Sequence, residues 1–107
     1  MQRYGSVIRV KPDKVEEYKC LHAAVWDGVA SMIRQCNIRN YSIFHKDGFL
    51  FSYFEYVGDD YEGDMAKMAS DAVTQEWWKL CMPCQEPLES RQEGEWWAVM
   101  EEVFHQD

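Results

Sequence analysis

Three side chains with rings and hydrogen-bonding atoms, Tyr18, His22 and Trp26, recur every fourth residue in the segment after the first proline. In an α-helix this spacing places them on one face, one turn apart. The same face carries apolar residues, so it is expected to turn toward the core. Because an imidazole has a reference pKa near ~6.5, it can give and take a proton at neutral pH. The trio therefore predicts a small buried site in which His22 performs acid–base chemistry.

Two adjacent tryptophans, Trp77 and Trp78, fall in a predicted helix over residues 72–81. Their side chains point about 100° apart, so at least one is expected to line a cavity. Flat indole faces suit the C–H face of a sugar, while a phenol such as Tyr18 and the imidazole of His22 offer placed hydrogen bonds for a polar ligand. A purely structural role stays open, with His22 as a satisfied core residue and the other rings as packing groups.

Other chemistries have weaker support. The segment Cys81-Met82-Pro83-Cys84 matches C-x-x-C, but it closes a predicted helix and no second pair follows. We interpret it as small residues near a proline-terminated helix end, in preference to a redox or zinc site. His22, His45 and His105 lie in different predicted elements, and the glycines are dispersed. We expect no metal and no cofactor.

The length of 107 residues predicts a single domain, residues 1–107. A net charge of −8 without clustered Lys and Arg argues against nucleic acid and anionic membranes as partners. The N-terminus begins directly in an alternating pattern, without the apolar run of a signal peptide or a membrane span. We therefore expect a cytoplasmic protein with four reduced cysteines.

The first half of the chain predicts a strand followed by one long helix. Residues 5–10 alternate as in a strand, and Pro12 ends it. Asp13 and Glu16 fit a capping box at the start of a helix that runs to Cys36, in which Gly28 weakens the helix without ending it. The predicted helix face comprises Val15, Tyr18, His22, Val25, Val29, Met32, Ile33 and Cys36.

The second half begins with a predicted β-hairpin. Strands over residues 38–45 and 49–57 are joined at Asp47-Gly48, a strong two-residue turn signal. A weaker helix around Tyr61 to Ala69 and the helix over residues 72–81 follow. Residues 85–95 read as an acidic surface loop, and residues 96–104 resume the alternation of a strand.

The resulting order, β-α-β-β-α-β, predicts an α+β fold of the ferredoxin-like type, an antiparallel sheet with helices on one face. The third strand has apolar side chains on both faces, which the helices cannot both cover. We therefore expect a homodimer in which two sheets face each other, as in dimeric α+β barrels.

Several segments, in order and with matching spacing, resemble the L-rhamnose mutarotase family. They are Val10-Lys11-Pro12-Asp13, Glu16-Glu17-Tyr18 with His22 and Trp26, Asn40-Tyr41-Ser42-Ile43, Trp77-Trp78-Lys79 and Glu102-Val103-Phe104. The resemblance implies a ferredoxin-like dimer that interconverts the α and β anomers of a monosaccharide, a six-carbon deoxysugar, without metal or cofactor. It also implies that His22 is the proton donor and that Tyr18, Tyr41, Trp77 and Trp78 contact the sugar.

Two segments depart from the family pattern. Residues 23–28 lack the prolines often found there, and the loop over residues 85–95 is longer and more acidic than expected. Both segments lie where they can reshape the mouth of the pocket, and the loop is a candidate lid. The resemblance implies L-rhamnose as the sugar, and the departures leave fucose or another deoxyhexose as alternatives. The base that takes the anomeric proton stays open between water, Tyr18 and a carboxylate. Two rival functions also stay open: a cofactor-independent monooxygenase of the dimeric-barrel type, and a non-catalytic sugar-binding module.

Overall fold

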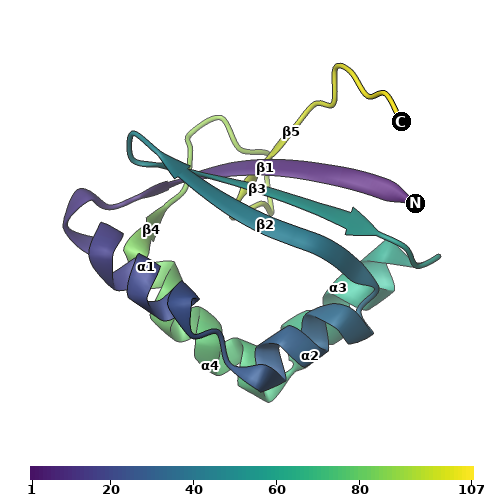
Figure 1. The fold of residues 1–107 in the computed structure, drawn as a ribbon, viewed down its shortest axis with the longest axis horizontal. Helices are drawn as coiled ribbons and strands as arrows, with labels where there is room; N and C mark the ends of the chain where they lie inside the picture. The colour runs from purple at the N-terminus through teal and green to yellow at the C-terminus, as the bar shows by residue number, and fades with distance from the viewer.

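The computed structural model describes residues 1–107 and contains a five-stranded antiparallel sheet with four α-helices against one of its faces (Figure 1). Short 3₁₀ turns lie at Pro12–Lys14 and Met82–Cys84. The elements in chain order are β1 (Gln2–Val10), α1 (Val15–Ala23), α2 (Asp27–Gln35), β2 (Ile38–Lys46), β3 (Phe49–Tyr56), α3 (Tyr61–Ser70), α4 (Ala72–Cys81), β4 (Gln85–Glu86) and β5 (Ala98–Met100).

The sheet has the order β2-β3-β1-β4, and β5 also pairs with β1. The hairpin between β2 and β3 turns at Asp47 and Gly48, whose φ angles of 53° and 81° are both positive. Positive φ at both central residues defines the type I′ turn, which matches the twist of the strands on either side. The α+β fold and the hairpin predicted from the sequence are confirmed.

The prediction of one long helix is wrong. The chain leaves helical geometry at Ala24 (φ −142°, ψ 62°), and α2 begins only after Trp26. The two short helices meet at an angle beneath the sheet (Figure 1), so Tyr18 and Val29 both reach the core. Gly28 lies where α2 approaches α4: a Cβ there would meet a Val73 methyl at 3.0 Å. The glycine therefore permits close helix packing.

The predicted capping box is also wrong. No side chain caps α1, because Pro12–Lys14 forms a 3₁₀ turn that leads directly into it. Aspartates do cap the later helices. The backbone N–H of Gly63 donates to Asp60 at the start of α3, and that of Thr74 donates to Asp71 at the start of α4.

The C-terminal region contains less strand than its alternation predicts. Only Ala98–Met100 pairs with β1, and the remaining residues have no neighbouring strand to supply hydrogen bonds. The tail leaves the body of the molecule (Figure 1), with Val103 84% and Phe104 77% exposed. The predicted surface loop begins instead with β4, in which buried Gln85 pairs with Val10.

The core lies between the helices and one face of the sheet. Its main cluster comprises Ile8, Val10, Tyr18, Val29, Leu50, Trp77, Cys81 and Cys84. The opposite face carries Phe44, Phe51 and Val7 side by side in register on β2, β3 and β1, and Phe44 is 63% exposed. None of the helices combines the length and apolar composition needed to cross a membrane.

Candidate active site between the helices and the sheet

A cavity of about 560 Å³ lies between the helices and the sheet, within the range of roughly 300–1,000 Å³ that is usual for ligand pockets. The structure brings all five sequence-predicted site residues to its wall: Tyr18 and His22 from α1, Tyr41 from β2, and Trp77 and Trp78 from α4. Most of the remaining wall is apolar. No Asp, Glu, Lys or Arg lines the cavity.

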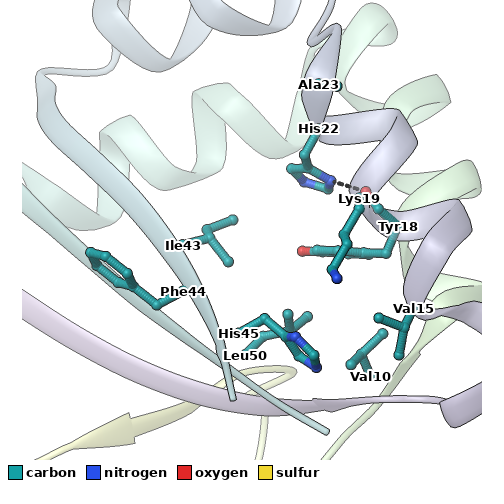
Figure 2. A pocket seen from close by; sticks show the side chains of 10 residues that line it. All are labelled: Val10, Val15, Tyr18, Lys19, His22, Ala23, Ile43, Phe44, His45 and Leu50. Carbon is teal, nitrogen blue, oxygen red and sulfur yellow. Dashed lines mark hydrogen bonds between the residues drawn. The ribbon is translucent and has the colours of Figure 1, made fainter. Parts of the chain in front are cut away.

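The His22 ring has one nitrogen fixed and one available. Its Nδ1 lies 2.9 Å from the Tyr18 carbonyl oxygen, one helical turn earlier (Figure 2). Because a carbonyl oxygen only accepts, Nδ1 must carry hydrogen. Nε2 is therefore the ring nitrogen left free to exchange a proton with a ligand. The ring is half-buried and stacks on the Tyr18 ring, with centroids 4.1 Å apart and an interplanar angle of 26°.

Trp77 closes the site on the α4 side. It is buried, and it meets the His22 ring edge-on at 5.3 Å between centroids. Trp26 also packs edge-on against Trp77, with centroids 5.2 Å apart. Because α1 ends before Trp26, this third member of the predicted trio supports Trp77 and does not line the cavity. Trp78, also expected at the site, does line it.

The Tyr18 hydroxyl has one hydrogen-bond partner in the protein. Gln85 Nε2 donates to it at 3.1 Å, and Trp96 Nε1 donates to Gln85 Oε1 at 2.7 Å. Tyr18 is 4% exposed, and burial raises the pKa of its phenol far above the ordinary value, while the bond from Gln85 acts in the opposite direction. Tyr18 therefore stays protonated at physiological pH.

Tyr41 lies on the opposite wall of the cavity. Its ring is 40% exposed, but burial of the hydroxyl end raises the pKa of the phenol to about 12. Burial likewise raises the pKa of the Cys81 thiol, which also lines the cavity, to about 12. Both groups are neutral at physiological pH, so they can offer hydrogen bonds but no charge.

Among the lining residues that the sequence did not predict for the site, three come from the segment after α4: Gln85, Trp96 and Trp97. Gln85 stood at the start of an assumed surface loop, and the two tryptophans began a predicted strand. The adjacent indoles of Trp96 and Trp97 in an otherwise acidic stretch were the one available signal, since solvent-exposed loops seldom carry such apolar area.

A second, smaller pocket of about 270 Å³ also has His22 on its wall. Figure 2 shows Tyr18 and His22 projecting from α1 toward Ile43 on β2. Lys19 and His45 also line this pocket. Tyr18, His22 and Ile43 also line the main cavity. The imidazole therefore borders both pockets.

The cysteines of the C-x-x-C segment are separate buried thiols. Cys81 and Cys84 are both free, and Cys84 Sγ lies 3.2 Å from Glu17 Oε2. The helix-closing position agrees with the structural interpretation of the motif. No group of three or more His, Cys, Asp and Glu side chains is arranged to hold a metal ion.

A family model described as L-rhamnose mutarotase matches residues 3–106. An L-rhamnose mutarotase of Oceanobacillus iheyensis is 31% identical over 107 residues, covering all of both chains. One of Bacillus subtilis is 38% identical over 85 residues, covering 78% of this chain and 79% of its own.

Two solved structures share the fold. An L-rhamnose mutarotase from Formosa agariphila superposes with a TM-score of 0.77 at 18% identity, covering all of both chains. Tetracenomycin F2 cyclase from Streptomyces glaucescens, a type-II polyketide cyclase, gives a TM-score of 0.75 at 16% identity, covering 100% of this chain and 98% of its own. Because the two catalyse different chemistries, these likenesses establish the α+β barrel fold alone.

Proposed function

This chain belongs to the L-rhamnose mutarotase family, and we propose that it interconverts the α and β anomers of L-rhamnose in the cavity between the helices and the sheet. Membership makes it an isomerase that acts on a carbohydrate. One observation carries the assignment of the site: His22, the residue type that exchanges protons near neutral pH, is the only histidine on the wall of a cavity that also holds Tyr18, Tyr41, Trp77 and Trp78.

The proposed reaction opens and recloses the sugar ring. Protonated His22 gives its Nε2 proton to the ring oxygen as the bond between that oxygen and C1 breaks, while the anomeric hydroxyl loses its proton to a base. The open-chain aldehyde then rotates about the C1–C2 bond. On closure the C5 hydroxyl attacks C1 and returns its proton to Nε2, and the carbonyl oxygen regains a proton. The sugar and the enzyme end with the protons they began with.

Water is the base we propose for the anomeric proton. The cavity wall contains no carboxylate, which removes one of the candidates considered from the sequence. Tyr18 is unavailable as a base because burial raises its pKa, which keeps the phenol protonated, and its oxygen already accepts a hydrogen bond from Gln85. The anomeric hydroxyl would then face the open side of the cavity.

The rest of the wall suits a deoxyhexose. We propose that an indole of Trp77 or Trp78 covers the C–H face of the ring and that the Tyr18 and Tyr41 hydroxyls bind its oxygens. Apolar side chains such as Val29, Ile33 and Met68 offer a place for the C5 methyl group. The names of the relatives favour L-rhamnose over fucose.

The uncovered face of the sheet is the proposed dimer interface. Phe44, Phe51 and Val7 form an apolar row on the side away from the helices, and two such faces packed together would bury it. Sedimentation velocity is expected to show a dimer, and Phe44→Glu is expected to shift it to monomer. Gln75→Glu, at an exposed position of α4, is the control, because it makes the same charge change outside the apolar row. A monomeric wild type, or a dimer unaffected by Phe44→Glu, would contradict this interface.

We place the protein in the cytoplasm, where its four free cysteines would remain reduced.

NMR saturation transfer between the anomeric protons of L-rhamnose tests the proposed activity. The protein is expected to accelerate exchange for L-rhamnose more than for fucose. Binding without acceleration would favour the sugar-binding module. Oxygen uptake with a quinol substrate, in the absence of sugar exchange, would favour the oxygenase.

A further inference from the structure

A directed chain of hydrogen bonds reaches the cavity from the C-terminal segment. Trp96 donates to Gln85, and Gln85 donates to Tyr18. The three side chains come from the segment before β5, from β4 and from α1, so only the fold brings them together. Gln85 is 6% exposed, so its bond to Tyr18 is buried away from competing water, while the bond from Trp96, which is 36% exposed, is partly buried.

The indole sets the direction of this chain. An indole N–H is a donor only, so the Gln85 atom that faces Trp96 must be the amide oxygen. The amide nitrogen then faces Tyr18, and an amide nitrogen does not accept hydrogen bonds. The Tyr18 oxygen is therefore the acceptor, and its own hydrogen must point elsewhere. The Tyr18 hydroxyl has no acceptor within the protein.

We propose that Gln85 and Trp96 are positioning residues, which hold the Tyr18 hydroxyl as a hydrogen-bond donor to an oxygen of the bound monosaccharide. The inference rests on the proposed function, since it assigns Tyr18 a direction of donation within that same site. Without the bond from Gln85, the hydroxyl could rotate and accept as readily as donate. With it, Tyr18 presents hydrogen to the cavity one helical turn from the Nε2 atom of His22.

The framework around the two residues is ordered. The backbone of Gln85 pairs with Val10 in the sheet. Before Trp96, the Glu95 carboxylate accepts from the backbone N–H groups of Gln92 at 3.0 Å and Val99 at 3.4 Å, which closes the turn. Trp96 therefore reaches Gln85 from a fixed position. The part of the acidic loop next to the site thus helps to hold the Trp96 side chain in place.

A double-mutant cycle on L-rhamnose affinity, measured by isothermal titration calorimetry, tests the proposal. Gln85→Met removes both hydrogen bonds at similar side-chain volume. It is expected to weaken binding about five- to tenfold in the wild-type background. In a Tyr18→Phe background, which has no hydroxyl to orient, the same substitution is expected to change affinity less than about twofold. An equal loss in both backgrounds would mean that Gln85 acts through general packing, and would overturn the inference.

Trp96→Phe provides a second variant that leaves Gln85 in place. It removes the indole N–H that fixes the amide, so it is expected to weaken binding about two- to fivefold, again only when the Tyr18 hydroxyl is present. Gln35→Met, on the exposed end of α2, is the matched control. An unchanged affinity in both Gln85→Met and Trp96→Phe would refute the positioning role.

The two levels of the proposal fail differently. Sugar binding with no acceleration of anomer exchange by the wild-type protein would refute the proposed function. The double-mutant cycle could still be measured in that case, because it depends on sugar affinity alone. Accelerated exchange without coupling between Gln85 and Tyr18 would keep the function and remove this inference.

Discussion

Replacing His22 by glutamine removes proton exchange while keeping a polar side chain of similar reach. The imidazole makes one hydrogen bond, from Nδ1 to the Tyr18 carbonyl, and two ring contacts, to Tyr18 and Trp77. A glutamine amide can donate a hydrogen bond, but it cannot deliver a proton to a ring oxygen and take it back. The substitution therefore separates acid–base chemistry from sugar binding.

The effect on rate should exceed the effect on stability. Loss of a general acid typically lowers the rate by ~10²–10⁴, which is about 3–5 kcal/mol of barrier at 1.36 kcal/mol per tenfold. One hydrogen bond contributes about 0.5–1.5 kcal/mol to folding, and each aromatic pair about 0.5–1.5 kcal/mol. His22→Ala forfeits all three contacts, whereas His22→Gln can retain the hydrogen bond. We therefore expect His22→Gln to stay folded and to lose at least a hundredfold in kcat/KM.

Saturation transfer on L-rhamnose at several sugar concentrations gives kcat/KM, after subtraction of the uncatalysed exchange. Circular dichroism melting confirms that the variant is folded at the assay temperature, and calorimetry reports its affinity for the sugar. His105→Gln in the exposed tail controls for the substitution itself. Retention of more than about a tenth of the wild-type kcat/KM by folded His22→Gln would refute the role of His22 as the proton donor.

Three further predictions concern the fold that holds the site. Gly48→Ala should lower the free energy of unfolding by about 1 kcal/mol, because φ at this position is +81°. No atom lies within 4 Å of the added Cβ, so the loss comes from the backbone alone, and the melting temperature should fall by about 4–8 °C. Asparagine tolerates this conformation better, so Gly48→Asn should lose less stability. Equal losses would point to another cause. Hydrogen bonds from Tyr56 and Asn37 lower the pKa of Asp64 in the folded protein. The ionised carboxylate therefore stabilises the fold at pH values above its ordinary pKa near ~4, and this stabilisation is lost as the pH falls through the lowered pKa. Asp64→Asn should therefore lower the melting temperature at pH 7, with the gap to wild type narrowing below pH ~4; a gap that is constant with pH would contradict this linkage. Iodoacetamide at pH ~8 should add one group per native chain, on exposed Cys20, because Cys36, Cys81 and Cys84 are buried and burial raises their thiol pKa values. Intact mass spectrometry should then show four groups after denaturation, and rapid native labelling of a second cysteine would show that the core opens.

Local signals predicted the elements whose geometry depends on near neighbours. The Asp47-Gly48 turn needs only two residues that tolerate positive φ between alternating strands, and it formed as expected. The end of the first strand was also predicted from a local signal, because Pro12 cannot continue a β ladder. In contrast, nothing local distinguished one helix over residues 15–36 from two. The bend at Ala24 serves to place Tyr18 and Val29 under the same curved sheet.

The sequence by itself predicted the candidate site residues: Tyr18 and His22 from their helical spacing, Trp77 and Trp78 as adjacent indoles, and Tyr41 from its place in the family resemblance. Tertiary structure alone decided that these five surround one cavity, that Trp26 packs against Trp77, and that Trp96 bonds to Gln85 and Gln85 to Tyr18. The physical reason is that helical periodicity specifies a face over a few residues. A hydrogen bond between residues 18 and 85 depends instead on how β4 docks beside β1, which no local spacing encodes.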